Sequence, residues 1–400
     1  MTTVMEWIGP LSVEERTAMA LAVAALVVLA VLSLLARFAG WRRAVLIVLA
    51  VLAVLIGGLA LRPVGLERMV SHPAPAADYA AAVAIYDADL APAPQPLNPL
   101  CEPALMSHGG KTDRVVVLIH GLSSCPRAFV DFAPAVFATG ANVLVARMPH
   151  HGYADRAADA LSKITAEELA AFGDRVVDAA AGLGDEVVVL GISGGGTVTG
   201  FLAQTRAEVD RAVLVAPLFG LGGTDRLTNS LIMRAMLTVP DISIWKDPAL
   251  RERFTGGMAH AYVRQSTRGT GELLRLAAAV TALAAERAPA AGEIAVATNA
   301  ADTAVSNAVT DDVVALWAAH GADLITTRFP AEHGLGHELI DPEEPGADPA
   351  LTYPVLLALV DGSFDAEVGN LAGPDDADPD ITGPGAAAPD AAGEAVSAPE

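Results

Sequence analysis

A serine flanked by glycines, Ser193, has the surroundings of a catalytic nucleophile. Residues 186–196 read EVVVLGISGGG, so an apolar β-rich run enters the pattern G-x-S-x-G at Gly191 and Gly195, and a helical pattern follows. On a sharp turn between a strand and a helix, small neighbours let the chain close and leave the serine hydroxyl exposed. The pentapeptide alone is a weak signal. Its place between strand and helix predicts that Ser193 attacks a carbonyl carbon.

A serine hydroxyl is a weak nucleophile, so a base must take its proton and a carboxylate usually orients that base. Asp302 is the predicted acid, because it lies in the turn TNAAD just after the apolar run 293–297. The loop FPAEHGLGHELID contains two histidines, His333 and His337. We favour His337 as the base because it lies farther into the loop and directly before an apolar stretch. His333 stays the alternative.

The oxyanion that forms during attack needs preorganised donors, which are usually two backbone amides. Gly194, directly after the serine, supplies one candidate amide. The other is expected in the loop after the apolar run 114–119, where Leu122 is the predicted donor. His120 precedes that loop, and we expect it to order the loop by hydrogen bonds. Chemistry of this kind needs neither a metal nor an organic cofactor.

The elements that must position these residues alternate along the chain between β-rich runs and helical patterns. This alternation predicts the α/β fold class, with a mostly parallel sheet covered by helices on both faces. Continuous hydrophobicity is typical of interior strands. The predicted strands span residues 114–119, 142–147, 186–190, 211–215, 293–297 and 323–329, and the clearest helices span 166–183, 195–206, 311–320 and 349–360.

One connection between predicted strands, residues 217–285, is longer than a single helix requires. It contains apolar and aromatic residues, and it follows a strand end, where ligands bind in open α/β sheets. We predict that it caps the site. An ordinary packing insertion is the alternative, because functional and structural loops of this length look alike.

Two uncharged apolar runs, residues 17–36 and 44–61, are each long enough to cross a membrane as a helix. The short turn between them, residues 37–43, contains three arginines. Positive charge near the ends of membrane spans is retained in the cytoplasm. We therefore predict an integral protein of the cell membrane with a transmembrane hairpin, and with both the N-terminus and everything after residue 62 outside the cytoplasm. A cleaved signal peptide or a buried pair of core helices is the alternative.

Composition divides the rest of the chain. Residues 1–16 form an N-terminal segment, and 62–106, rich in Ala and Pro, are predicted to be a stalk. The folded domain is expected over 107–362, and the acidic residues 363–400 are predicted to be a disordered tail. With 47 acidic and 25 basic residues the net charge is −22, which argues against a nucleic-acid partner. Protein partners are not indicated by the sequence.

The chain has two cysteines, Cys101 and Cys125, both in the part predicted to lie outside the cytoplasm. A disulfide would persist there, and closing a loop of this length would contribute about 3 kcal/mol. Two unrelated buried thiols are the alternative, and metal binding by this pair is less favoured.

Taken together, these motifs resemble those of the α/β-hydrolase superfamily. The resemblance rests on His120-Gly121 after a strand, the serine between Gly191 and Gly195, Asp302, and His337-Glu338-Leu339. More narrowly, the sequence is similar to a bacterial branch of serine esterases and lysophospholipase-like hydrolases of the serine aminopeptidase type. That similarity covers about residues 100–360 and is carried by residues 101–103, 108–109, 120–121, 125–126, 148–152 and 337–342.

The resemblance implies an α/β-hydrolase fold with a cap insertion and hydrolysis of a small ester, with a lipid-like or hydrophobic acyl group suiting a membrane-tethered site. Acyl transfer and amide hydrolysis use the same machinery, and a non-catalytic ligand-binding or scaffold protein on this fold is the rival from another class. The residues that it implies are a triad of Ser193, Asp302 and His337 and an oxyanion hole at Leu122 and Gly194.

The resemblance also favours a disulfide between Cys101 and Cys125, which would brace the oxyanion loop. The membrane hairpin and the acidic tail lie outside the part of the chain that it covers.

Overall fold

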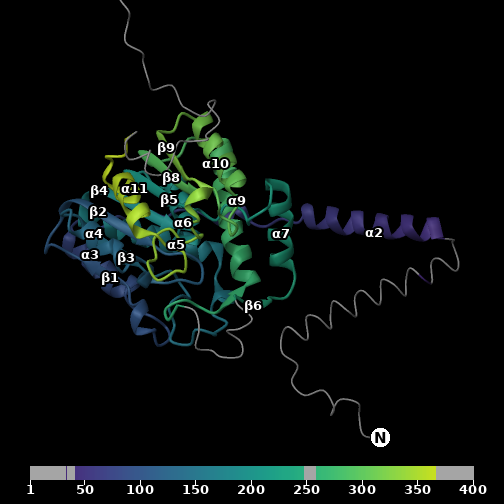
Figure 1. Cartoon of the computed structure of the whole chain (residues 1–400), viewed down its shortest axis with the longest axis horizontal. Coiled ribbons are helices and arrows are strands. Elements are labelled where there is room, and N and C mark those ends of the chain that lie inside the picture. The colour runs from purple at the N-terminus through teal and green to yellow at the C-terminus, as the bar shows by residue number, and fades with distance from the viewer. Residues whose placement is uncertain (1–32, 34–40, 247–257, 366–400) are drawn as a thin grey trace, which may run out of the picture.

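The computed structural model describes residue 33 and residues 41–246 and 258–365. In these residues a seven-stranded sheet has the order β1-β3-β2-β4-β5-β8-β9, and all its neighbours are parallel except β1, which pairs antiparallel with β3 (Figure 1). A separate antiparallel pair is formed by β6 and β7. The strands are β1 Ala104–Met106, β2 Thr112–Ile119, β3 Asn142–Ala146, β4 Gly184–Ile192, β5 Arg211–Val215, β6 Ser243–Trp245, β7 Arg264–Ser266, β8 Glu293–Asn299 and β9 Leu324–Phe329.

Helices cover both faces of the sheet because successive side chains of each strand point to opposite sides. In β2, Val115 and Val117 belong to the buried cluster on the face that α5 and α6 cover, whereas Val116 and Leu118 belong to the cluster that includes residues of α4 and α11. The helices are α2 Trp41–Ala60, α3 Tyr79–Ile85, α4 Phe132–Phe137, α5 Ala166–Leu183, α6 Gly194–Thr205, α7 Arg226–Thr238, α9 Thr267–Glu286, α10 Asn307–Ala319 and α11 Pro349–Asp361.

Short helical turns complete the connections, and several of them lie next to functional loops. They are 3-10 turns at Leu66–Arg68, Pro99–Cys101, Pro126–Phe129, Leu161–Lys163 and Ala331–His333, and a π-helical turn at Tyr86–Leu90.

The predicted α/β class and mostly parallel sheet are confirmed, and all six predicted strands are present within two residues at each end. The predicted cap, residues 217–285, is divided by the structure. Its last part is α9, which packs against α6 and α5 and belongs to the layer that covers the sheet. Only the stretch before α9, with α7, β6 and β7, forms an excursion from the layered domain.

The segment predicted as a stalk, residues 62–106, is instead part of the folded domain. Met69, Ala82 and Leu90 are buried in the core beside α5, and β1 adds an edge strand to the sheet. Polar contacts also fix the segment, since Asp174 on α5 accepts hydrogen bonds from the Ser71 hydroxyl and the His72 amide. Its many small residues allow this close approach to α5, which composition alone does not reveal.

The predicted membrane hairpin is not seen. Its first half, residues 17–36, lies outside the described residues except for Ser33, and its second half, 44–61, coincides with α2. Among the helices of the described ranges, none is both long and apolar enough to cross a membrane. Large apolar side chains of α2 are exposed, including Leu46 and Val54, and the helix extends from the domain beside α7 (Figure 1). Most of the predicted tail also lies outside the described residues.

Candidate active site

Ser193 lies on a strained turn between β4 and α6. Its φ is 55° and its ψ is −115°, a backbone conformation that a residue with a side chain rarely adopts. The turn is held from both sides, because the Ser193 amide donates to the Val215 carbonyl and the Ser193 carbonyl accepts from the amides of Thr197 and Leu218. The strain is therefore maintained by the parallel sheet and the first turn of α6, as expected at a functional site.

The glycines around Ser193 are required by close backbone approaches. A Cβ at Gly191 would lie 2.3 Å from the Gly195 carbonyl oxygen, and one at Gly195 would lie 2.1 Å from the carbonyl oxygen of Ile119. Neither neighbour is a flexible side chain. The spacing G-x-S-x-G thus reflects packing of the turn against the end of β2.

The loop after β2 lies against the nucleophile. A Cβ at Gly121 would be 3.7 Å from Ser193 Oγ, and one at Gly194 would be 3.1 Å from the Leu122 nitrogen. The amides predicted for the oxyanion hole are therefore close together at the start of α6. The positive end of the helix dipole also favours a negative charge at this point.

His120 orders this loop through hydrogen bonds of its ring to the backbone. Its Nε2 accepts a hydrogen bond from the Met148 amide, so its Nδ1 carries the proton and donates to the Gly121 carbonyl. The ring is fully buried, and burial above all lowers the pKa of His120 well below its usual value. Both ring nitrogens are occupied by the backbone, in keeping with the predicted ordering role.

Asp302 and His337 meet at the carboxyl ends of β8 and β9. His337 Nδ1 and Asp302 Oδ2 are 2.6 Å apart, and the other carboxylate oxygen accepts from the amides of Ala304 and Val305. Burial raises the pKa of Asp302, but its hydrogen bond with His337 and the charge of that ring outweigh burial, so the net shift is downward. Burial lowers the pKa of His337, and the contact with Asp302 reverses this and raises it.

Asn299, at the end of β8, holds the loop that carries His337. Its side-chain amide donates to the carbonyls of Leu335 and Gly336, at 3.0 and 2.8 Å. Sequence reasoning missed this residue. The available signal was its position, since a polar residue at the end of a buried strand next to the predicted acid is placed to bind the neighbouring loop.

One pocket contains the predicted nucleophile, base and oxyanion loop. It has a volume of about 170 Å³, and Ser193 and His337 both line it. No hydrogen bond joins these two side chains in the described part of the chain, while His333 is exposed and does not line the pocket. The other lining residues are Gly121, Leu122, Ser123, Ser124, Leu218, Leu221, Lys246, Met258, Ala261, Gln265, Ala304, Val305, Glu338 and Glu344.

The polar part of this lining was not predicted. Lys246 reaches in from the end of β6 and donates from Nζ to the Ser123 hydroxyl at 3.2 Å. Gln265 comes from β7, and Glu338 and Glu344 follow the predicted base in the chain. The position of Glu338 next to His337 could have pointed to it. The length of the predicted cap, residues 217–285, places the segment of Lys246 near the site but does not single out that residue.

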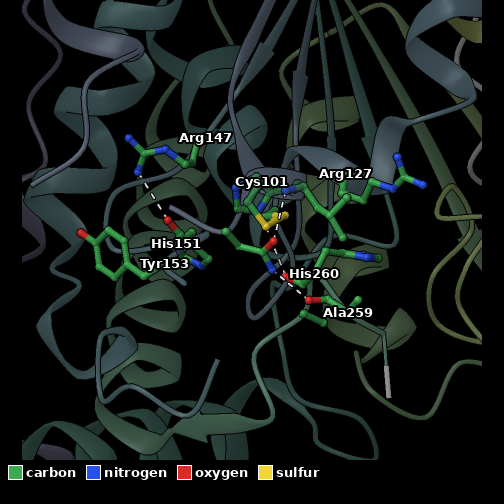
Figure 2. The surroundings of a disulfide bond; sticks show 12 residues. Cys101, Arg127, Arg147, His151, Tyr153, Ala259 and His260 are labelled. Carbon is green, nitrogen blue, oxygen red and sulfur yellow. Dashed lines mark hydrogen bonds between the residues drawn. A yellow bond between two sulfur atoms is a disulfide. The ribbon is translucent and has the colours of Figure 1, made fainter. Parts of the chain in front are cut away.

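A disulfide joins Cys101 to Cys125, and both cysteines are fully buried. It links the segment before β1 to the oxyanion loop. Arg147 donates to the His151 carbonyl close to the disulfide (Figure 2). The side chain of Asn98 donates to the Ala259 carbonyl. The pairing favoured by the resemblance is therefore present, and it joins the segment before β1 to the loop after β2.

Three further contacts hold the segment that begins at residue 258 in place. The Tyr262 amide donates to the Ser123 carbonyl, and the Tyr262 hydroxyl donates to the His150 carbonyl. His260 Nε2 lies 2.7 Å from Asp341 Oδ2, and both side chains are fully buried. No group of three or more His, Cys, Asp or Glu residues in the described ranges is arranged to hold a metal ion.

Comparisons with known proteins found similar solved structures and a matching family model. Similar solved structures include one from the work on LipS and LipT, two metagenome-derived lipolytic enzymes. It is 18% identical, with 67% of this chain and 100% of that chain covered and a TM-score of 0.48. The monoacylglycerol lipase of Paleococcus ferrophilus is 17% identical, with 65% of this chain and 98% of that chain covered and a TM-score of 0.48. A monoglyceride lipase of Saccharomyces cerevisiae is 13% identical, with 64% of this chain and 90% of that chain covered and a TM-score of 0.48. A search of curated proteins found no match. The model of the alpha/beta hydrolase family matches residues 116–383, and the chain therefore belongs to the alpha/beta hydrolase family.

Proposed function

We propose that this protein is a serine hydrolase that cleaves carboxylic esters through an acyl-enzyme on Ser193. The observation that carries the proposal is the combination of the strained Ser193 turn with the His337–Asp302 pair, because Ser193 and His337 line the same pocket. Each group follows the carboxyl end of a parallel strand, where ligands bind in this class of sheet. Family membership alone does not fix an activity, because this fold hosts many functions.

In the first half of the proposed reaction, Ser193 Oγ attacks the ester carbonyl carbon while His337 Nε2 takes the hydroxyl proton. Asp302 binds the other ring nitrogen, Nδ1, which sets the tautomer and stabilises the imidazolium. The amides of Leu122 and Gly194 stabilise the oxyanion. The carbon–oxygen bond to the alcohol then breaks, and the alcohol leaves with the proton from His337.

In the second half, water attacks the carbonyl carbon of the acyl-enzyme and gives a proton to His337. The bond to Ser193 Oγ breaks, the proton returns to that oxygen, and the carboxylic acid is released. The raised pKa of His337 suits a base that must hold this proton transiently.

Covalent labelling with a fluorophosphonate probe tests this proposal. We expect the full chain to label and to hydrolyse 4-nitrophenyl butyrate, and Ser193→Ala to lose the label and at least about 10⁴-fold of its kcat. Equal labelling of Ser193→Ala, or neither labelling nor turnover by the intact protein, would contradict it. His333→Ala serves as a matched control, because this exposed histidine lies on the same loop outside the pocket.

We also propose that residues 17–61 attach the protein to the cell membrane, with the domain outside the cytoplasm. The apolar run 17–36 and the exposed apolar side chains of α2 support attachment, and the disulfide suits an oxidising compartment. Protease added to intact cells should digest the domain while the protein stays in the membrane fraction. Full protection of the domain would contradict the orientation, and recovery in the soluble fraction would contradict attachment.

A further inference from the structure

Ser123, in the loop after β2, has a backbone conformation that is rare for a residue with a side chain. Its φ is 70°, in the left-handed region that favours glycine. Such a conformation is strained and persists only where the surroundings hold it. Ser123 directly follows Leu122, whose amide is one of the two proposed oxyanion donors. The contacts that hold Ser123 therefore affect the path of the backbone at this donor.

Leu122 and Ser123 are the two central residues of a tight turn. The Ser124 amide donates to the Gly121 carbonyl at 3.3 Å, which closes the turn. A positive φ at the third residue is characteristic of a type II turn, and glycine or asparagine usually occupies that position. A serine there is strained where a glycine would not be, and its hydroxyl group is what it adds to the turn.

Two hydrogen bonds hold Ser123, and both of their donors come from the excursion before α9. The Tyr262 amide donates to the Ser123 carbonyl at 2.8 Å, and Lys246 Nζ donates to the Ser123 hydroxyl at 3.2 Å. Ser123 is 5% exposed, so water competes little for its oxygens. The side chain and the main chain of this strained residue are therefore both bound by a segment more than a hundred residues away.

Lys246 and Tyr262 belong to one structural unit, the pair of strands β6 and β7. Trp245 of β6 lies opposite Arg264 of β7, and the guanidinium carbon of Arg264 lies over the Trp245 ring at 5.6 Å from its centre. The Lys246 amide extends the pairing by donating to the Val263 carbonyl at 3.0 Å. The two donors are thus fixed relative to each other before they reach Ser123.

This unit is anchored to the loop after β3. The Tyr262 hydroxyl accepts from the Tyr153 amide and donates to the His150 carbonyl, both at 3.1 Å. Burial raises the pKa of the Tyr262 hydroxyl, so it stays protonated and can donate. The Val263 amide donates to the Arg156 carbonyl at 3.1 Å. The position of the strand pair is therefore set by residues that do not line the pocket.

We propose that Lys246 is a positioning residue for the reaction on Ser193. Its ammonium group holds the Ser123 hydroxyl, which keeps the turn in its strained form and the Leu122 amide beside Gly194, where the oxyanion forms. The Leu122 nitrogen lies 3.1 Å from the place that a Cβ on Gly194 would take. This inference rests on the proposed esterase function and assigns part of its transition-state stabilisation to the excursion.

A lysine that lines the pocket could instead bind an anionic part of the substrate directly. The two roles make different demands on Ser123. Direct binding would act on KM and would not need the Ser123 hydroxyl. Positioning acts on kcat, and it acts only through that hydroxyl.

A double-mutant cycle on the full-length protein separates these roles, with 4-nitrophenyl butyrate as the substrate. We expect Lys246→Met and Ser123→Ala each to lower kcat about tenfold and to change KM less than about threefold, since loss of a whole oxyanion donor costs about 10²- to 10³-fold. The double variant should be no slower than either single variant, because both substitutions remove the same hydrogen bond.

The pH of the comparison must be chosen with His337 in mind. Burial and the charge of Lys246 lower the pKa of His337, against the stronger effect of Asp302. Loss of the lysine therefore also moves the titration of the base. The variants are compared on the alkaline plateau of the pH profile, where this base is neutral in all of them.

A trifluoromethyl ketone reports on the oxyanion hole without turnover. Ser193 Oγ bonds to its carbonyl carbon, the carbon–oxygen double bond becomes a single bond to a negatively charged oxygen, and His337 takes the serine proton. We expect the inhibition constant of 1,1,1-trifluorohexan-2-one to rise about tenfold in Lys246→Met, in parallel with the fall in kcat. Lys111→Met is the matched control and should change neither quantity, because Lys111 forms an exposed ion pair with Asp185 outside the pocket.

The outcomes separate this inference from the proposed function. Unchanged kcat in Lys246→Met, or a double variant slowed by the product of the two single effects, would overturn the positioning role. A rise in KM with unchanged kcat would assign Lys246 to substrate binding instead. Lys246 is exposed, so Lys246→Met should fold, and its inhibition constant decides the question if Ser123→Ala does not fold. Absence of both probe labelling and turnover by the wild type would refute the proposed function itself.

Discussion

The two walls of the pocket are built in different ways. The wall that carries Ser193 consists of buried strands and a helix start, and backbone atoms approach within contact distance at Gly191 and Gly195. The opposite wall consists of loops after β8 and β9 and of the excursion before α9. Individual side-chain hydrogen bonds hold this wall, including the Asp302–His337 contact and the bond that the Asn299 side chain donates to the Leu335 carbonyl.

The two walls should respond differently to substitution. Close packing in the first wall couples the position of Ser193 to folding, because a dense core does not accept added atoms. In the second wall each of these hydrogen bonds joins two loops. Losing one should therefore change the reactivity or selectivity of the enzyme more than its folding. Substitutions in the two walls should therefore differ in whether they change folding or reactivity.

Replacing Asp302 should disable catalysis without unfolding the protein. Asp302→Asn keeps an oxygen for the Ala304 and Val305 amides but no longer fixes the tautomer of His337. We expect kcat/KM to fall about 10³- to 10⁴-fold, or 4 to 5 kcal/mol in barrier height.

The pH profile provides a second readout of the same substitution. The base must be neutral, so activity falls as pH drops through the raised pKa of His337, and loss of the carboxylate should move this acidic limb to lower pH. Asp311→Asn, in an exposed ion pair with Arg328, is the control. A fall in kcat/KM of less than tenfold for Asp302→Asn would mean that the Asp302–His337 hydrogen bond does not govern reactivity.

Adding one methyl group to the first wall should be costly to folding. The Cβ of Gly195→Ala would meet the Ile119 carbonyl, so we expect the free energy of unfolding to drop by about 3 kcal/mol in urea titrations. Gly110→Ala is the control, since no atom lies within 4 Å of its added Cβ. Equal stability of the two variants would contradict the contrast between the walls.

The disulfide joins the two kinds of structure, and its removal should act mainly on stability. Replacing both Cys101 and Cys125 by Ser should lower the free energy of unfolding by about 2 to 3 kcal/mol, given a sequence separation of 24 residues. Dithiothreitol should have the same effect on the wild type and none on the double variant. Identical melting of wild type and variant under oxidising conditions would show that the bond adds no stability.

Glu338 should make stability depend on pH in a way that reports its burial. Because its folded pKa of about 7 lies above the unfolded value of 4.5, its contribution is fully present below pH 4.5 and is lost as pH rises through 7. Relative to Glu338→Gln, the wild type should lose about 2 kcal/mol of unfolding free energy between pH 4 and pH 8, allowing for partial solvent screening. Parallel pH curves for the two proteins would contradict a buried carboxyl.

The sequence predicted the first wall better than the second. Strands β2, β4 and β5 have long apolar runs and were placed within two residues, because continuous burial requires continuous hydrophobicity. β1 was missed because its three residues become a strand only by pairing with β3. The sequence likewise does not show that α9 belongs to the layer that covers the sheet, because this depends on its contacts with α5 and α6 and not on its own helical pattern.

The pocket residues likewise divide into those with a local sequence signature and those without one. Ser193 and its glycines have a local signature, since strand, turn and helix are consecutive in the chain. Lys246 and Ser124 have none, because their neighbours in space come from segments more than a hundred residues away, as the Lys246–Ser123 contact illustrates. The catalytic roles of Asp302 and His337 stay predictions that the kinetics above would test.

The packing of residues 69–106 on α5 sets the boundary of the smallest fragment that can be expressed. Arg206, which is fully buried, pairs with Asp174 and Asp178, and these carboxylates also bind the backbone at His72 and Ala74. A fragment that starts at residue 107 would expose the core around Ala82 and leave part of this charge cluster without partners. A soluble fragment for crystallisation or assay should therefore begin before Met69.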